Sequence, residues 1–252
     1  MILAENITKK YRGEAVLKGA HAAFPEGKLI AFIGGNGAGK STMLNIISRL
    51  LPPSEGCVKI DAAPLGKWNS RELAKRLTIL SQTLYTPARI TVGELVSFGR
   101  FPHSNGALSQ SDKEMIDASL ELTGMSCFKG RFLDELSGGQ RQMAYIAMSI
   151  AQDTKYLLLD EPLNNLDMSR SVKIMKILKR LVRERQKTVF IVIHDINFAS
   201  FYADYVAAFK DGELKYQGGA SEIMRPEILS DIYGMDISVE ECGGKKICLY
   251  YE

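Results

Sequence analysis

The most constraining feature of this chain is the stretch at residues 34–41, GGNGAGKS, which fits the pattern G-x-x-x-x-G-K-[ST]. The apolar run at residues 29–33 precedes it and predicts a short buried strand. Apolar residues follow it at helical spacing: Met43, Ile46, Ile47 and Leu50. This spacing predicts a helix that buries one face and that Pro52-Pro53 ends. A strand, a glycine-rich loop and a helix in this order predict a phosphate-binding loop.

Such a loop has a direct physical basis. Glycines allow consecutive backbone N–H groups to point at one centre, and the helix N-terminus adds partial positive charge there. Lys40 would reach the β- and γ-phosphates of a nucleotide, and the Ser41 hydroxyl would ligate Mg²⁺. The residues predicted to contact the nucleotide are Gly34, Gly35, Asn36, Gly37, Ala38, Gly39, Lys40, Ser41 and Thr42. The alternative is a glycine-rich turn that happens to precede a helix.

Composition excludes several other classes of protein. The chain has 252 residues, of which 46% are hydrophobic and 24% charged, as in an ordinary globular protein. Its net charge of +3 is too small to imply nucleic-acid binding. No apolar run approaches the roughly 18 residues of a membrane span, and no secretory signal is visible. The four cysteines form no C-x-x-C pair, which predicts reduced thiols in a cytoplasm.

Strands are expected at both ends of the chain. Residues 2–11 and 15–24 predict an antiparallel hairpin joined at Arg12-Gly13. Tyr11 closes the first of these strands and is either an aromatic platform for adenine or an ordinary hairpin tyrosine. Further strands are predicted at residues 57–61, 78–82, 156–160, 188–193, 205–209 and 213–216, with a D-G turn at Asp211-Gly212 and a last hairpin over 237–251.

The middle of the chain is rich in helix. Helices are predicted at residues 70–77, 91–100, 109–123 and after Ser137, and later around 174–181 and over 221–233. We therefore predict a helical subdomain over residues 88–152, inserted between residues 1–87 and 153–252. The outer face of the helix around 174–181 is basic and reads either as a nucleic-acid stripe or as a solvated face. The absence of interleaved aromatic residues favours the solvated face.

A second glycine-containing stretch, LSGGQ at residues 136–140, opens one of these helices. Ser137 and Gln140 fit an S-x-x-Q capping box. That account leaves Gly138 and Gly139 unexplained, since each costs roughly 1 kcal/mol inside a helix. A helix start with bare N–H groups also binds anions. The stretch is therefore predicted to make a second phosphate contact through Ser137, Gly138, Gly139 and Gln140.

Polar side chains end three of the predicted strands. The apolar strand that starts at Tyr156 ends in Asp160 and Glu161, and a buried parallel strand presents such residues at the ligand edge of its sheet. Asp160 would hold Mg²⁺ and Glu161 would polarise the attacking water. Gln82 would reach the metal and the water, or is a surface glutamine. His194 would contact the γ-phosphate, or is a strand-end histidine satisfied by backbone.

In this order the motifs resemble those of the nucleotide-binding subunits of ABC transporters, over nearly the whole chain. Residues 34–41 match the family's Walker A motif, Gln82 the Q-loop, residues 136–140 the LSGGQ signature and 156–160 Walker B. Residues 164–167 match the D-loop, although they begin Asn-Asn where Ser-Ala is frequent, and Gly35 replaces a frequent proline. The resemblance implies an α/β P-loop NTPase (RecA-like) core with an N-terminal antiparallel β subdomain and an inserted helical subdomain.

The resemblance also implies how such a chain works. Two copies would pair head to tail. Residues 137–140 of one copy would then close on ATP held by Lys40 of the other. Glu161, His194 and Lys40 would be catalytic, ATP and Mg²⁺ the cofactors, and Ser41, Gln82 and Asp160 the metal ligands. Separate transmembrane permease subunits, and indirectly a substrate-binding protein, would be the partners, with no nucleic acid. The subunit would lie peripherally on the cytoplasmic face of the cell membrane.

Two stretches narrow the branch of the family. Residues 91–103 and 194–204 resemble ATPases of bacterial importers for ferric siderophores, haem and cobalamin, with the siderophore branch closest. His103 lies in the first stretch and reads as a loop residue rather than an iron ligand. The rival class is a non-transport ABC protein that acts on ribosomes or DNA. A single cassette without sustained heptads argues against that class.

Overall fold

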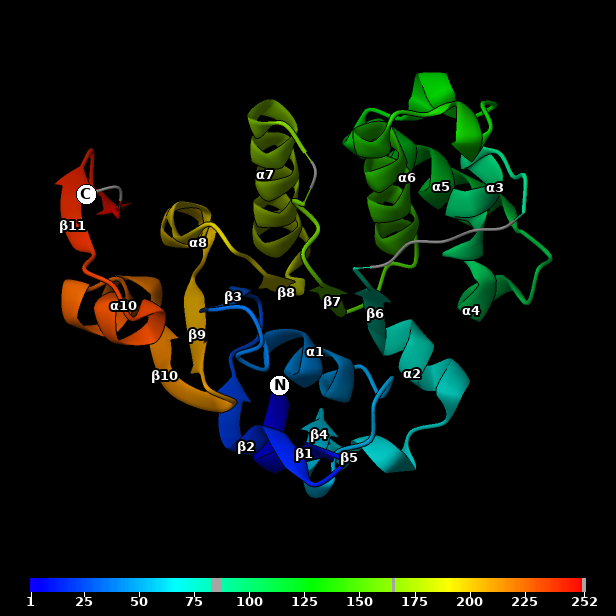
Figure 1. Cartoon of the computed structure of the whole chain (residues 1–252). Coiled ribbons are helices and arrows are strands. Elements are labelled where there is room, and N and C mark those ends of the chain that lie inside the picture. The colour runs from blue at the N-terminus through cyan, green and yellow to red at the C-terminus, as the bar shows by residue number, and fades with distance from the viewer. Residues whose placement is uncertain (83–87, 165, 251–252) are drawn as a thin grey trace. The chain divides into compact units, whose positions relative to one another are not determined.

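The computed structural model describes residues 1–82, 88–164 and 166–250 (Figure 1). The chain forms two compact units, residues 1–68 with 188–252, and residues 69–187, and each is described by itself. The predicted helical subdomain, residues 88–152, lies within the second unit, and its boundaries stay a prediction.

An antiparallel sheet opens the first unit. Its strands are β1 (Ile2–Tyr11), β2 (Glu14–Phe24), β4 (Glu55–Ile60) and β5 (Ala63–Pro64), in the order β2-β1-β4-β5. The predicted hairpin is confirmed, and Arg12 and Gly13 between its strands have φ of 49° and 90°. Positive φ at both turn residues matches the right-handed twist of the strands on either side.

The second sheet segment of this unit is mostly parallel. It contains β3 (Leu29–Gly34), β8 (Thr188–Val192), β9 (Tyr205–Lys210) and β10 (Glu213–Gly219). β3 runs parallel to both β8 and β9, and β10 pairs antiparallel with β9 through the predicted turn at Asp211-Gly212. All residues of β3 and β8 are buried, as expected for parallel strands covered on both faces.

An aromatic cluster fills the core beside β3. The rings of Phe24, Phe32, Phe190 and Phe209 have centroids 5.2–5.9 Å apart, and each side chain is almost fully buried. Tilted and edge-on ring pairs at these distances add to the area they bury. The cluster therefore fixes the strand that leads into the glycine loop.

The helix after that loop, α1 (Lys40–Ile47), buries Met43, Ile46 and Ile47 as predicted. The expectation for Leu50 was wrong, because Leu50 is 59% exposed. The helix ends at Ile47, and Arg49 then turns the backbone with a φ of 64°. The apolar spacing therefore continues for one residue beyond the helix, and Pro52 plays no part in ending it.

The remaining elements of this unit are α8 (Ile196–Tyr202), α9 (Ala220–Ile223), α10 (Pro226–Tyr233), β11 (Ser238–Cys242) and β12 (Lys245–Leu249). Of these, α9 and α10 pack on the β9–β10 hairpin, while α8 packs on β3 and on β12. The prediction of one helix over 221–233 was wrong, because Arg225 is extended and Pro226 begins a new helix. The last hairpin is confirmed, with Gly243 and Gly244 at its turn.

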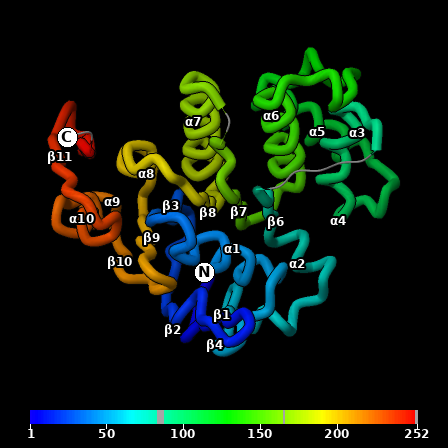
Figure 2. Tube along the Cα trace, in the orientation of Figure 1, coloured from blue at the N-terminus to red at the C-terminus, as the bar shows by residue number. Residues whose placement is uncertain are grey.

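The helix α10 lies beside β9 (Figure 2), and a carboxylate ties it to the β9–β10 hairpin. Asp231 accepts hydrogen bonds from Lys215 at 2.9 Å, Lys210 at 3.0 Å and Tyr216 at 3.0 Å. The Lys215 and Lys210 ammonium groups lower the pKa of the Asp231 carboxyl to about 2. The C-terminal helix is therefore anchored to the sheet that also carries β3.

The second unit holds the expected helices. Its elements are α2 (Ser70–Arg76), β6 (Leu77–Leu80), α3 (Val92–Phe98), α4 (Phe101–Ser104), α5 (Gln110–Thr123), α6 (Gly138–Ala151), β7 (Tyr156–Leu159) and α7 (Met168–Arg185). β6 and β7 are parallel, and α6 packs on α3 and α5 (Figure 2). The predicted strand at 78–82 ends earlier, at Leu80, and the short helix α4 was not predicted.

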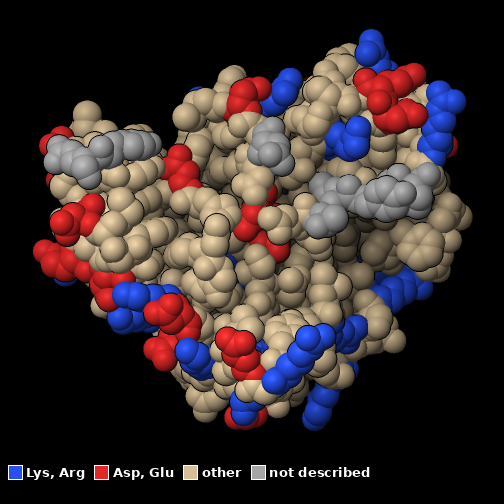
Figure 3. All heavy atoms as spheres, in the orientation of Figure 1, with Lys and Arg blue, Asp and Glu red and all other residues tan. Residues whose placement is uncertain are grey.

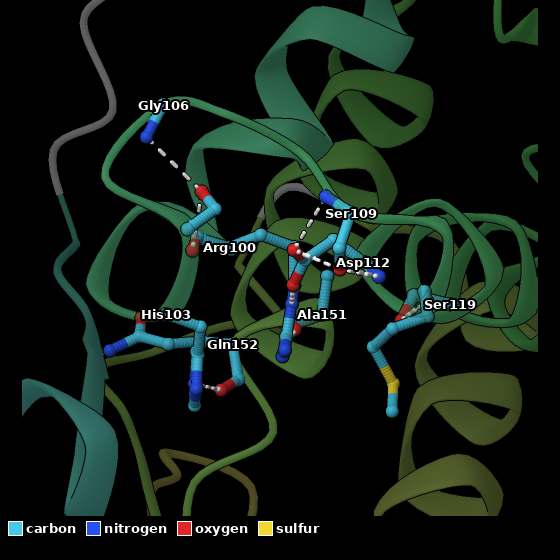
Figure 4. Close-up of polar contacts among 10 residues, drawn as sticks. Arg100, His103, Gly106, Ser109, Asp112, Ser119, Ala151 and Gln152 are labelled. Atoms are coloured by element: carbon cyan, nitrogen blue, oxygen red, sulfur yellow. Dashed lines mark hydrogen bonds and ion pairs between the residues drawn. The ribbon is translucent and has the colours of Figure 1, made fainter.

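A buried polar network joins the ends of three of these helices (Figure 4). Arg100 donates to Asp112 Oδ1 and to the carbonyl of Ala151, both at 2.8 Å. His103 Nε2 lies 2.9 Å from the carbonyl oxygen of Gln152. The prediction of a loop residue was wrong, because His103 lies in the short helix α4. The Gln152 side chain in turn donates to the carbonyl of Ala74 at 2.6 Å. These bonds fix the C-terminal end of α6.

Surface features agree with the composition. Lys and Arg side chains mingle with Asp and Glu over the face seen in Figure 3, without a broad area of one sign. The helix α7 is amphipathic as predicted, with Ile174, Ile177, Leu178 and Leu181 buried and Lys173, Lys176, Arg180 and Arg183 exposed. In the part of the chain that is described, no helix combines the length and apolarity of a membrane span.

Candidate functional site

Two glycines of the loop at 34–41 are required by the backbone itself. Gly34 has a φ of 135°, and a Cβ there would lie 2.1 Å from the carbonyl oxygen of Phe209. Gly39 has a φ of 101° and a Cβ there would lie 3.1 Å from Leu17 Cδ1. The predicted arrangement of strand, loop and helix is confirmed, and these two positions exclude other residues.

The start of α1 is open to an anion. Gly39 is its N-cap residue and supplies no side-chain hydrogen bond to the first turn. Lys40 is 5% exposed, and its ammonium donates to the carbonyls of Gly34 at 2.8 Å and Gly35 at 2.7 Å. Ser41 and Thr42 are half-buried in the same turn. Uncapped N–H groups beside a buried cation favour phosphate oxygens at this point.

His194 lies at the same end of β3. It is exposed and follows Ile193, whose N–H donates to the carbonyl of Phe32 at 3.1 Å. Phe32 is two residues before Gly34, so β8 delivers His194 beside the strand that carries the glycine loop. Tyr11, at the end of β1, is 47% exposed, and the Lys9 ammonium lies 5.2 Å from the centre of its ring. The Tyr11 ring is therefore partly exposed, with the Lys9 ammonium over one face.

The predicted carboxylates lie at the end of β7 in the second unit. Asp160 is 4% exposed, and its N–H donates to the carbonyl of Leu80 at 2.9 Å. Glu161 follows with a φ of 51°, in the left-handed region. A residue with a side chain in that region costs about 1–3 kcal/mol, and such outliers gather at functional sites. The buried carboxylate of Asp160 is thus followed by a strained turn at Glu161.

The Glu161 carboxylate is held by two amides. Its Oε2 accepts from Gln82 Nε2 at 2.6 Å and from Asn164 Nδ2 at 2.5 Å. The structure therefore brings Gln82 and Glu161 together, although they are 79 residues apart in sequence. The sequence placed Asn164 in the D-loop match but did not predict its contact with Glu161. The spacing of three residues between the two was the signal that could have predicted this contact. Asn165, the next residue of the same stretch, lies outside the described residues.

The LSGGQ stretch starts α6 with a complete capping box. Gln140 N–H donates to Ser137 Oγ at 3.3 Å, and Ser137 N–H donates to Gln140 Oε1 at 2.9 Å. A Cβ on Gly139 would lie 2.5 Å from Arg170 Nη1, the end of a flexible side chain. A Cβ on Gly138 would meet no described atom within 4 Å. The cap accounts for Ser137 and Gln140, while nothing described in this chain requires glycine at 138.

Comparison with known proteins gives a consistent family. The family model described as ABC transporter matches residues 17–164. The chain is 47% identical over 251 residues to the petrobactin import ATP-binding protein YclP of Bacillus subtilis (strain 168), covering 100% of both chains. It is 39% identical to the iron(3+)-hydroxamate import ATP-binding protein FhuC of the same organism, covering 96% of this chain and 91% of that relative.

A solved structure has the same fold. It is the ATP-binding cassette determined as a dimer in a post-hydrolysis state bound to ADP and Pi, with a TM-score of 0.79 and 32% sequence identity. The match covers 87% of this chain and 99% of that one. The similarity therefore extends over both units of the chain.

Proposed function

This chain belongs to the ABC transporter family as an ATP-binding subunit, and we propose that it energises the import of a ferric siderophore into a bacterial cell. It is an ATPase coupled to transport, and such subunits work as dimers with transmembrane permease subunits. The main support for a siderophore as the cargo is the 47% identity over the full length to a petrobactin import subunit. The identity of 39% to an iron(3+)-hydroxamate import subunit supports the same cargo class.

The glycine loop is the proposed seat of the ATP phosphates. Lys40 would exchange its two carbonyl partners for the β- and γ-phosphate oxygens, and the open N–H groups of α1 would complete the cradle. His194 would contact the γ-phosphate from the end of β8. The exposed ring of Tyr11 would stack on adenine. Glu161 would orient and polarise the attacking water, with Gln82 and Asn164 fixing its carboxylate.

The residues proposed for Mg²⁺ suit that ion. Ser41, Gln82 and Asp160 offer a hydroxyl, an amide oxygen and a carboxylate, which are the hard oxygen ligands that Mg²⁺ prefers. Gln82 donates to Glu161 through its nitrogen, so its amide oxygen is the end left for a metal. When bound, Mg²⁺ neutralises charge between the β- and γ-phosphates.

A head-to-tail dimer would complete the site. In it, Ser137, Gly138, Gly139 and Gln140 of one copy face the nucleotide held by the other. Gly138 supports this arrangement, because no described atom of its own chain lies where a side chain would be. We further propose that the dimer lies on the cytoplasmic face of the membrane and receives cargo through a substrate-binding protein, with no nucleic acid involved.

Replacement of Glu161 by Gln tests the function. The variant keeps the shape and the amide contacts but loses the anion, so it should bind ATP normally and hydrolyse it about 10²–10⁴-fold more slowly. Cells that carry it should bind labelled ferric siderophore at the surface, fail to accumulate iron and stop growing under iron limitation. Glu184→Gln, on the exposed end of α7, is the matched control and should behave as wild type.

The possible results separate the parts of the proposal. Turnover within about twofold of wild type in the Glu161→Gln variant would reject Glu161 as the catalytic carboxylate, since a general base contributes at least about 10²-fold. Loss of haem or cobalamin uptake with normal siderophore uptake would keep the importer and move it to a neighbouring cargo class. Normal uptake of all three would reject the import function.

A further inference from the structure

Asn197, close in sequence to His194, makes two contacts with one backbone residue. It lies in the first turn of α8, three residues after His194. Its Nδ2 donates to the carbonyl of Cys248 at 3.1 Å, and its Oδ1 accepts from the N–H of Cys248 at 2.8 Å. One side-chain amide thus satisfies both backbone groups of a residue in β12, as a neighbouring strand would.

Other bonds extend the contact between α8 and the β11–β12 hairpin. Ser200 Oγ donates to the carbonyl of Lys246 at 2.6 Å, and the Lys245 ammonium donates to the carbonyl of Phe201 at 3.1 Å. Cys248 is 1% exposed, and burial raises the pKa of its thiol to about 11. The thiol is therefore neutral at physiological pH and serves here as a small apolar group. The hairpin is packed on α8 rather than trailing from it.

His194 sits between two fixed points of the backbone. On one side, Ile193 bonds to Phe32 in β3. On the other, Asp195 caps α8 by accepting from the N–H of Asn197 at 2.8 Å, and Asn197 is bound to the hairpin. The residues on either side of His194 are therefore tied to β3 and, through Asn197, to the C-terminal hairpin.

The last helix of this unit ends in a buried tyrosine. Tyr233 ends α10, and its buried hydroxyl has no hydrogen-bond partner among the described residues. Burial raises the pKa of Tyr233 to about 12, and electrostatic interactions with Cys248 and Asp195 raise it further.

We propose that Asn197 is a positioning residue for ATP hydrolysis, which holds His194 toward the nucleotide by fixing α8 to the C-terminal hairpin. The inference rests on the proposed function, because it takes the role of His194 from there. The hairpin becomes part of the support of the ATP site rather than a tail appended to it.

The first test replaces Asn197 by Leu, which is similar in size and leaves both Cys248 backbone groups without their partner. The variant should bind ATP as wild type does, since the glycine loop is untouched. Its kcat should fall by between about 10-fold and 100-fold, because displacement of a catalytic group by roughly 1 Å costs up to about 100-fold. Asn197→Asp keeps the acceptor for the Cys248 N–H but loses the donor to the Cys248 carbonyl. Its kcat should therefore lie between those of wild type and Asn197→Leu.

Ser200→Ala is the matched control. It removes a bond from the same helix to the same hairpin, one turn further from His194. It should lower thermal stability without lowering kcat. Equal losses of kcat in the Ser200 and Asn197 variants at equal loss of stability would overturn the inference, because general loosening of the hairpin would then explain both.

A double-mutant cycle with His194→Ala is decisive, measured on the full-length chain. If Asn197 acts through His194, then Asn197→Leu should cause no further loss of kcat once His194 is replaced. If the losses of kcat from Asn197→Leu and His194→Ala multiply in the double variant, the inference would be overturned, while the catalytic role of His194 would stand. If His194→Ala alone leaves turnover unchanged, the inference falls with the proposed role of His194. The import function, tested through Glu161 and siderophore uptake, would stand in either case.

Discussion

The helices α1 and α6 both start at a glycine motif, but the two starts are built in opposite ways. The first turn of α1 receives no side-chain cap, begins at a left-handed glycine and lies beside buried Lys40. The first turn of α6 is capped within the chain by Ser137 and Gln140. The start of α6 is thus capped by side chains of a single copy, whereas the N-cap residue of α1 provides no side-chain cap.

A third helix start shows what a purely structural cap requires. Ser109 and Asp112 form a capping box at the start of α5, with hydroxyl, backbone and carboxylate bonds of 2.7–3.2 Å and no glycine. The cap of α6 uses the same geometry, so capping alone gives no reason for Gly138. The glycine at 138, which the cap of α5 lacks, is therefore the feature of α6 that motivates the proposed contact with a second copy of the chain.

Gly39→Ala should break the open start most severely. The φ of 101° is unfavourable for alanine by about 1–3 kcal/mol, and the new Cβ would lie 3.2 Å from the carbonyl oxygen of Val16. We expect a lower unfolding temperature and loss of ATP binding, measured by thermal scans and by titration with labelled nucleotide. Gly35→Ala is the matched control for stability, because a Cβ there meets no described atom within 4 Å. Equal stability of the two variants would contradict the requirement for glycine at 39.

Gly138→Ala should separate stability from turnover at the capped start. Alanine is a better helix former, so the isolated chain should gain up to about 1 kcal/mol of unfolding free energy. If a second copy approaches Gly138 across ATP, the same methyl group should lower turnover and weaken the ATP-dependent dimer, seen by gel filtration. Wild-type turnover in a stabilised variant would remove the main support for the shared site.

Ser137→Ala should cost about 1 kcal/mol of unfolding free energy, as loss of an N-cap usually does. Denaturant unfolding measures this loss directly. If Ser137 also contacts phosphate, turnover should fall by more than the stability loss explains, whereas Ser109→Ala, the equivalent change at α5, should lower stability alone. Parallel losses of stability and turnover in both variants would favour a capping role only.

The smallest effect concerns pH. The Ser109 hydroxyl and then Arg100 lower the pKa of Asp112 from 3.8 to about 2. Because the folded pKa is depressed, Asp112 stabilises the fold above its ordinary pKa, and this contribution is lost as the pH falls from about 4 to about 2. The cap of α6 uses Gln140, which does not titrate. The loss of stability with falling pH should therefore be less steep in Asp112→Asn than in wild type. In Gln140→Glu it should be steeper than in wild type, because that variant places a titrating carboxyl in the cap of α6. An unchanged acid unfolding curve in Gln140→Glu would contradict this account.

Local patterns were sufficient for most of the fold. The glycine loop, the hairpins and the capped helix starts each depend on residues close in sequence, and these predictions are confirmed. The errors at Leu50 and at residues 221–233 arise where an apolar period continues past a local backbone change. For residues 221–233 the signal was present, because Pro226 marks a helix start. The ending of α1 depends on a left-handed Arg49, which no residue type announces.

The sequence identified most of the residues of the site, but it did not predict which of them contact one another. The sequence identified Gln82 and Glu161 separately, yet their 2.6 Å bond exists because β6 and β7 pair in parallel, with Asp160 N–H bonded to Leu80. The role of Asn164 in holding Glu161 depends on that turn, and the grip of Asn197 on Cys248 spans 51 residues. Such pairs depend on tertiary packing, which periodicity and spacing do not encode.

The two carbonyl partners of Lys40 affect how nucleotide leaves as well as how it arrives. A buried ammonium without partners is costly, so departing phosphate would face a steep barrier if it left Lys40 bare. The carbonyls of Gly34 and Gly35 recapture the ammonium instead. Binding is then an exchange of acceptors, and the measured affinity reports a difference between two sets of bonds. Replacement of these two carbonyl bonds would therefore set part of the affinity for phosphate.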